Sequence, residues 1–128
     1  MTHPILALQA TLVAALRGAS LTVFDAPPAG TLPPYVTIAR HDVLAHDGDD
    51  TPGYEHRLLL HAWVADPSRK AVVALTEAVV TATLAANLSS DALLVTLRRH
   101  DRTDSVIDAT TGRARAAIAM TFYSEPND

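Results

Sequence analysis

The stretch EHRLLLHAWV, residues 55–64, decides the fold. Successive side chains of a strand point to opposite faces of a sheet, so positions of equal parity share a face. The even positions from 58 onward are apolar: Leu58, Leu60, Ala62 and Val64. The odd positions are mixed: Arg57, Leu59, His61 and Trp63. We therefore predict a strand over 54–65 with a core on one face, and with the only tryptophan of the chain on the other.

Helical periodicity marks one segment at the N-terminus and one just after this strand. The first helix is predicted over 4–17, because it opens with a proline and is followed by Gly18. Its apolar stripe is Ile5, Leu8, Leu12 and Leu16. The second is predicted over 66–86, with Asp66 as its N-cap and Asn87 in the left-handed conformation that ends it. Its stripe is Val72, Leu75, Val79, Val80 and Leu84.

The other segments are predicted as strands and turns. Short strands are expected over 20–24 and 35–41, and a closing hairpin has its turn within 101–112. The segment 42–53 is acidic and rich in Gly and Pro, so we expect a flexible loop or hairpin tip. The order is helix, strand, strand, strand, helix, strand, strand, in a single domain over 1–128. Two helices cannot cover both faces of such a sheet. The predicted class is α+β, with both helices on one face of a mostly antiparallel sheet of four to five strands.

Composition excludes several classes of protein. A chain of 128 residues with 48% hydrophobic content is sufficient for one packed core. The net charge of −4 argues against a basic surface that wraps nucleic acid. Cysteine is absent, which excludes disulfides and thiolate chemistry. The sequence shows no secretory signal and no apolar stretch typical of a membrane span. We therefore expect a soluble protein that is synthesised in a cytoplasm.

Six histidines and the acidic loop invite a search for a site. His56 and His61 are five positions apart on one strand, so they face opposite sides and cannot bind one ion. Asp47, Asp49 and Asp50 lack the spacing and the closing glutamate of an EF-hand loop. Neither a glycine-rich phosphate loop nor a nucleophile elbow occurs. We therefore expect no catalytic residue, no cofactor and no metal.

Charges are distributed unevenly along the chain. Half of the basic residues lie in the closing hairpin: Arg98, Arg99, Arg102, Arg113 and Arg115. Acidic residues gather around the predicted loop: Asp42, Asp47, Asp49, Asp50 and Glu55. One interpretation is a solvated sheet face opposite a solvated loop. The other is a charge-polarised subunit that meets copies of itself or other neighbours through complementary surfaces. A nucleic-acid groove is disfavoured, since Asp101, Asp104 and Asp108 interrupt the basic hairpin.

Several short motifs occur in an order that resembles a known family. They are VFDAPP at 23–28, PYVTI at 34–38, EHRLLLHAW at 55–63, RKA at 69–71 and TGRAR at 111–115. Together they are similar to the tail-completion, or tail-terminator, proteins of long-tailed phages and of gene transfer agents. The resemblance covers nearly the whole chain, and the second and third motifs are its most distinctive parts. The acidity of the loop after Asp42 departs from the pattern.

The resemblance implies a structural protein of a virion or phage-like particle, assembled in the bacterial cytoplasm. The expected form is a ring of identical subunits, a hexamer, that caps the tail tube at its head-proximal end. The implied partners are further copies of the chain, the tail tube protein and a neck or head-completion protein. DNA would pass through the channel without sequence-specific binding, and no membrane is involved. The family has no catalytic residues that could be assigned to positions of this sequence.

For the contact between copies we expect the outward face of the central strand and arginines of the closing hairpin. These residues are Arg57, Leu59, His61, Trp63, Arg98 and Arg115. Asp47, Asp49 and Asp50 are expected to contact the tube or the neck. The alternative for Trp63 is that it packs under a helix or under the N-terminal segment.

Two other classes of function stay open. One is a small α+β ligand-binding domain or enzyme with a pocket lined by His41, His61 and the loop 47–50. The other is a different ring subunit of the same particle, such as a tube or head-completion protein. A bound metal or a deep pocket would favour the first. A ring in solution would favour a tail terminator.

Overall fold

The chain forms two helices and five strands, and the computed structural model describes residues 3–48 and 52–127. In chain order the elements are α1 (Pro4–Gly18), β1 (Val23–Phe24), β2 (Tyr35–Ala45), β3 (Tyr54–Val64), α2 (Arg69–Ala85), β4 (Leu93–Asp108) and β5 (Arg113–Pro126). This order is the predicted one, and the predicted α+β class is confirmed.

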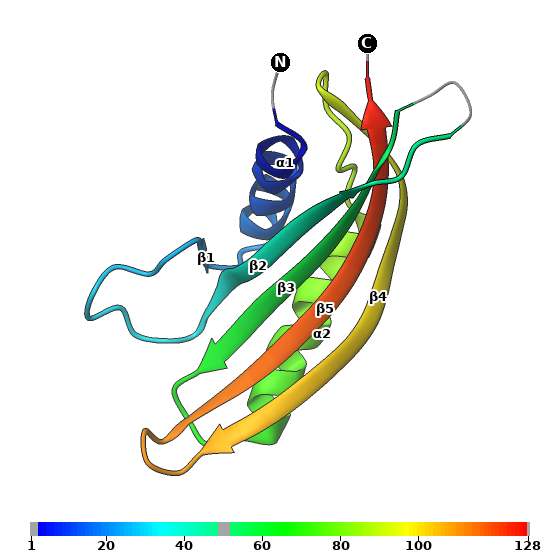
Figure 1. The fold of residues 1–128 in the computed structure, drawn as a ribbon. Coiled ribbons are helices and arrows are strands. Elements are labelled where there is room, and N and C mark those ends of the chain that lie inside the picture. The colour runs from blue at the N-terminus through cyan, green and yellow to red at the C-terminus, as the bar shows by residue number, and fades with distance from the viewer. Residues whose placement is uncertain (1–2, 49–51, 128) are drawn as a thin grey trace.

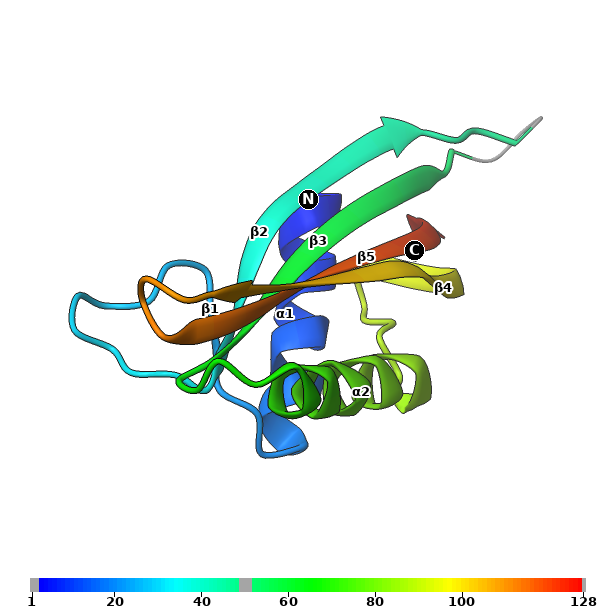
Figure 2. The same ribbon diagram turned by 90° about the horizontal axis from the view of Figure 1, so that it is seen from below.

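The strands form one sheet in the order β1-β2-β3-β5-β4. The short β1 pairs with β2 in parallel, and every other neighbouring pair is antiparallel. The long strands lie side by side as a curved ribbon (Figure 1). Both helices lie on the same side of this ribbon (Figure 2). Within the described residues, no helix covers the other face of the sheet, as the alternation in β3 predicts.

The core lies between the helices and one face of the sheet. Its largest fully buried side chains come from α1 and from the central strands β3 and β5. They include Leu8, Leu12, Leu16, Leu60, Ile118, Met120 and Phe122. The apolar set predicted for β3 is buried as expected, with Leu60 and Ala62 fully inaccessible to solvent. Burying each large aliphatic side chain stabilises the fold by about 1.5–3 kcal/mol, so this layer dominates stability.

The second helix departs from prediction at both ends. Its N-cap is Ser68, whose hydroxyl accepts a hydrogen bond from the Ala71 N–H at 3.1 Å, so the expected N-cap Asp66 is wrong. At the other end, Asn87 is not left-handed, and the cap residue Ala86 is extended. Leu84 is 39% exposed instead of buried. The deepest positions include Thr76 and Thr83, whose hydroxyls donate to carbonyls four residues earlier: Val72 O and Val79 O.

The hairpins are longer and their turns shorter than predicted. Residues 42–45 of the predicted loop 42–53 belong to β2, and the segment between β2 and β3 is 46–53. In this segment the Asp47 carboxylate accepts a hydrogen bond from the Gly53 N–H at 3.0 Å, and His46 stacks on Tyr123 with ring centroids 4.7 Å apart. Asp49 and Asp50 lie outside the described residues. In the closing hairpin β4 continues to Asp108, so residues 101–108 are strand and not turn.

Register shifts interrupt the alternation of two strands. In β2 the shift falls at Ala39, between Ile38 and Arg40. In β4 shifts fall at Thr96 and at Asp101. A β-bulge adds one unpaired residue, so every side chain beyond it changes face relative to a simple alternation. These bulges decide which polar side chains of β2 and β4 meet the helices.

Candidate assembly surfaces

Four of the expected interface residues project from β3 on the face without helices, and Arg115 of β5 joins them. Trp63 pairs with Arg115 across the two strands, and the guanidinium lies 6.0 Å from the centre of the Trp63 ring. The His61 ring meets the same tryptophan edge-on at 6.2 Å. Trp63 thus lies neither under a helix nor under the N-terminal segment. Tyr35 of β2 pairs with Trp63 from the other side. We call Tyr35, His61, Trp63 and Arg115 the tryptophan cluster.

The tryptophan cluster is partly desolvated even in the single chain. Burial, and secondly the charge of Arg115, lower the pKa of His61. The Arg115 Nε is buried and has no hydrogen-bond partner within the described chain. Such a donor ordinarily finds a partner, because an unpaired buried polar group costs about 1–3 kcal/mol. The cluster is therefore a surface on which a further contact would be favourable.

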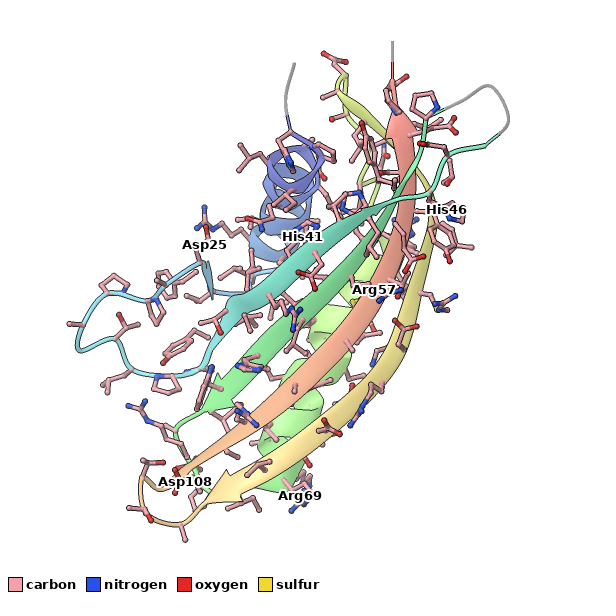
Figure 3. All side chains as sticks on the ribbon, in the orientation of Figure 1. Asp25, His41, His46, Arg57, Arg69 and Asp108 are labelled. Carbon is pink, nitrogen blue, oxygen red and sulfur yellow. The ribbon has the colours of Figure 1, made fainter. Side chains whose placement is uncertain are left out.

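The remaining charges of this face are arranged in local ion pairs. Arg57 bonds Glu55 at 2.7 Å, and each pair joins side chains two positions apart on one strand. The other pairs are Arg40–Asp42, Arg99–Asp101 and Arg102–Asp104. Exposed pairs of this kind add about 0–1 kcal/mol each to stability. Their main effect is to neutralise much of the arginine charge on the face, whose side chains Figure 3 displays. Between them lies an open hollow of about 420 Å³, which Arg40, Asp42, Arg57 and Leu59 help to line.

Arg98 does not belong to this outward face, so its expected position is wrong. The bulge at Thr96 turns it toward the helices, where it pairs with Phe122 of β5. Its guanidinium donates to the carbonyl of Thr83 at 3.4 Å and to the carbonyl of Ala86. These carbonyls are at the C-terminal end of α2, where partial negative charge favours a cation. Arg98 is a cap of α2.

We expect Arg98→Ala to lower the free energy of unfolding by about 1–3 kcal/mol, because α2 loses a charged donor to its last carbonyls. Arg99→Ala is the matched control: it removes the same side chain from the next position, where it bonds Asp101 on the exposed face and no carbonyl of α2. Urea unfolding followed by circular dichroism measures both. Equal losses in the two variants would contradict the capping role of Arg98.

The histidines form a contact that the sequence did not suggest. The bulge at Ala39 turns His41 toward the helices, where its Nε2 lies 2.9 Å from Nδ1 of the fully buried His56. Two more hydrogen bonds extend this contact: the Gln9 side chain bonds His41 at 3.2 Å, and the Ser124 hydroxyl bonds His56 at 2.7 Å. This hydrogen-bond network links α1, β2, β3 and β5. Figure 3 shows His41 directed toward α1.

The pocket of the alternative hypothesis does not assemble. His41 lies on the helix side of the sheet, whereas His61 lies on the outward side beside Trp63. Asp47 is beyond the opposite end of β3 from His61. No group of three or more potential metal ligands occurs within residues 3–48 and 52–127. No helix in the described part of the chain is long and apolar enough to cross a membrane.

The described residues define a small α+β subunit with an uncovered sheet face and open sheet edges, in which the titratable groups are dispersed. The chain belongs to the family whose model is described as "Tail completion protein gp17", which matches residues 6–123. It is thus a structural component of a virion tail.

A solved structure supports the fold. The chain resembles a chain of the structure described as "Virion of native gene transfer agent (GTA) particle", with a TM-score of 0.78 and 21% sequence identity. The match covers 92% of this chain and 94% of the other. No curated protein matches the sequence. The family expected from the sequence motifs is therefore confirmed.

Proposed function

We propose that the chain is one protomer of a closed ring, a hexamer, that ends the tail tube at its head-proximal end and joins the tail to the neck. The observation that carries this proposal is the family match over residues 6–123 together with a sheet that keeps one face and two edges uncovered. A protomer of a ring needs two different surfaces, because each copy meets the next head to tail.

The two ends of the strands offer surfaces for the neighbours above and below such a ring. The tryptophan cluster lies at one end, where Tyr35 begins β2 and Trp63 is the last residue but one of β3. The β2–β3 hairpin with Asp47 lies at the other end. We assign one end to the tube and the other to the neck. Among the residues first expected to join copies, Arg57 lies toward the hairpin and Leu59 at the middle of β3, whereas His61, Trp63 and Arg115 lie toward the cluster end.

The proposed function involves no catalysis. In the described structure the titratable groups with lowered pKa values are the pair His41 and His56, His61 and two carboxylates of β4, and they do not converge on one cavity. DNA would pass the ring without sequence reading, since many of the arginines on the outward face are neutralised by carboxylates of the same strand.

Deleting the gene for this chain tests the function. We expect the deletion to yield particles whose tails vary in length and lack a joined head, because nothing ends tube growth. Electron microscopy of the deletion strain measures tail length, and gold labelling of a tagged chain in complemented particles locates it. Tails of normal length in the deletion strain, or label along the whole tube, would refute the proposal. Light scattering at several concentrations shows whether the isolated chain already forms a ring.

A further inference from the structure

Both outer edges of the sheet are open over part of their length. The two-residue strand β1 pairs only with Val36 and Thr37, so from Ile38 to Ala45 the described β2 has no neighbour on that side. At the other edge, β4 has no partner strand on its outer side within the described structure. The unpaired N–H and C=O groups of an open edge are a template for a further strand.

Bulges divide these edges into irregular and regular parts. The first half of β4 carries two bulges, at Thr96 and Asp101, whereas 102–108 is regular. This regular half exposes Val106 (49%) and Ile107 (38%). In β2 the regular part follows the bulge at Ala39 and covers 40–45, with Leu44 40% exposed. A bulge disrupts pairing, so only the regular halves suit a partner strand.

The backbone of the regular half of β4 already accepts an outside donor. Arg69 of α2 donates from Nη1 to the Ser105 carbonyl at 3.2 Å and also contacts the Ser105 hydroxyl. That carbonyl therefore points away from β5. In an antiparallel strand the N–H and C=O of one residue point to the same side, so alternate residues of 102–108 present both groups outward. Because the Arg69 side chain is long and exposed, an incoming strand can displace it from the Ser105 carbonyl.

We propose that residues 102–108 of one copy pair antiparallel with residues 40–45 of the next copy, which joins the sheets edge to edge. The inference rests on the proposed ring and names its joint. The strands β2 and β4 run in opposite directions within one sheet, since three antiparallel steps separate them. Successive copies can therefore be joined without reversing a subunit, and the joint is heterologous, as a ring requires.

The short strand β1 sets the stagger of this joint. It occupies the edge of β2 at Val36 and Thr37, so an incoming strand can pair only beyond it. Within one sheet, Val106 is level with Tyr35, and Leu44 is level with Leu97. These two levels are about eight residues apart along β3, or roughly 26 Å at 3.3 Å per residue.

The stagger agrees with the geometry of closed sheets. Each copy contributes four long strands, which span roughly 19 Å at 4.8 Å per strand. A rise of about 20–26 Å over that width tilts the strands by roughly 45–55°, near the 35–45° typical of barrels. Pairing at equal heights would leave the strands untilted, and it would place the bulged half of β4 against β2. The regular halves are thus the ones that a closed ring would bring together.

The absence of cysteine permits a clean test by cross-linking. The variant Leu44→Cys/Val106→Cys places one thiol in each regular half, on the outward face. Opposed residues in a non-hydrogen-bonded pair have Cα atoms about 4.5 Å apart, within disulfide range. The control Leu44→Cys/Leu97→Cys moves the second thiol to the bulged half of β4, where Leu97 is similarly exposed at 41%. All three side chains are partly exposed, so folding should be preserved, which far-UV circular dichroism checks.

Purified particles that carry each variant are oxidised and run on a non-reducing denaturing gel. We expect the Val106 variant to give a ladder of disulfide-linked multimers, with most of the protein in multimers and the largest band at the mass of the complete ring. The Leu97 variant should stay monomeric. A third variant, Leu44→Cys/Asp104→Cys, covers a register shifted by two residues. If neither the Val106 nor the Asp104 variant forms a ladder in normal particles, or if the Leu97 variant does, the joint is wrong although the ring stands. If the chain is absent from the particles, the proposed function itself is wrong.

Discussion

Replacing Trp63 by alanine is expected to leave the chain folded and to give particles whose tails vary in length. The side chain lies on the face opposite the helices and takes no part in the buried core. We therefore expect a loss of at most about 1–2 kcal/mol in the free energy of unfolding, from the contacts with Arg115 and His61. Normal far-UV dichroism and a modest shift in the urea midpoint would show that the fold is retained.

The large effect is expected in assembly. Burying a tryptophan side chain at a contact contributes about 2 kcal/mol on area grounds, a factor of about 30 in affinity. In the proposed ring this contact repeats in every copy, so the losses add up at the junction with the neighbouring component of the tail. The tail lengths of particles made with the variant, measured by electron microscopy, report this docking directly.

Leu97→Ala is the matched control for Trp63→Ala. Leu97 is also an apolar side chain of the outward face, 41% exposed, but it lies at the hairpin end of the sheet. We expect its removal to leave tail length unchanged or to disturb the opposite junction. Normal tails from the Trp63→Ala chain would contradict the assignment of the tryptophan cluster to a contact. An unfolded variant would show instead that Trp63 is part of the core.

Much of the fold follows from periodicity in uninterrupted elements. The strand β3 contains no register shift, and its alternation correctly placed Trp63 outside and Leu60 inside. The apolar stripe predicted for α1 is buried at Leu8, Leu12 and Leu16. In a regular helix that packs along one side, the core-facing positions recur with the helical period, so they can be predicted from spacing. The ends of α2 were less predictable. Asp66 and Ser68 are both good N-cap residues, and the local sequence does not decide between them.

The errors at the candidate site have a common cause in the bulges. A strict alternation from Val95 puts Arg98 outside, and the extra residue Thr96 puts it inside, against the end of α2. In the same way, Ala39 brings His41 to the helix side, where it meets His56. No residue type at these positions demands a bulge, since neither is a glycine. The outward-facing side chains could therefore be predicted in β3, but not in β2 and β4.

Acid is expected to weaken the fold between pH 6.5 and pH 4 because of the His41–His56 pair. Burial lowers the pKa of both histidines from 6.5 to about 4. For His41 the neighbouring Asp42 opposes this shift, and for His56 the charges of His41 and His3 add to it. Between these pH values the unfolded chain binds protons that the folded chain does not, so stability falls as the pH falls. Above pH 6.5 both states are neutral at these positions and the effect disappears.

The magnitude of this loss of stability, and the pH range in which it occurs, distinguish it from the titration of carboxylates. A shift of this size corresponds to about 3 kcal/mol for one fully buried group, and we expect about 2–4 kcal/mol for the coupled pair, since His41 is only half-buried. For Asp101, burial acts to raise the pKa, but hydrogen bonds from Thr121 and Arg99 and the Arg99 charge lower it below its ordinary 3.8. Its contribution is therefore lost only below about pH 4, outside the window.

Urea unfolding at half-unit steps from pH 4 to pH 7.5 measures the loss, and nuclear magnetic resonance of the imidazole protons assigns it. His41→Gln removes one titrating group while keeping a polar side chain within reach of His56. We expect this variant to lose at least a third of the pH dependence. His46→Gln, an exposed histidine stacked on Tyr123, should retain all of it. If the two variants show the same slope, or if His56 titrates near 6.5 in the folded chain, the histidine pair is not the origin of the acid sensitivity.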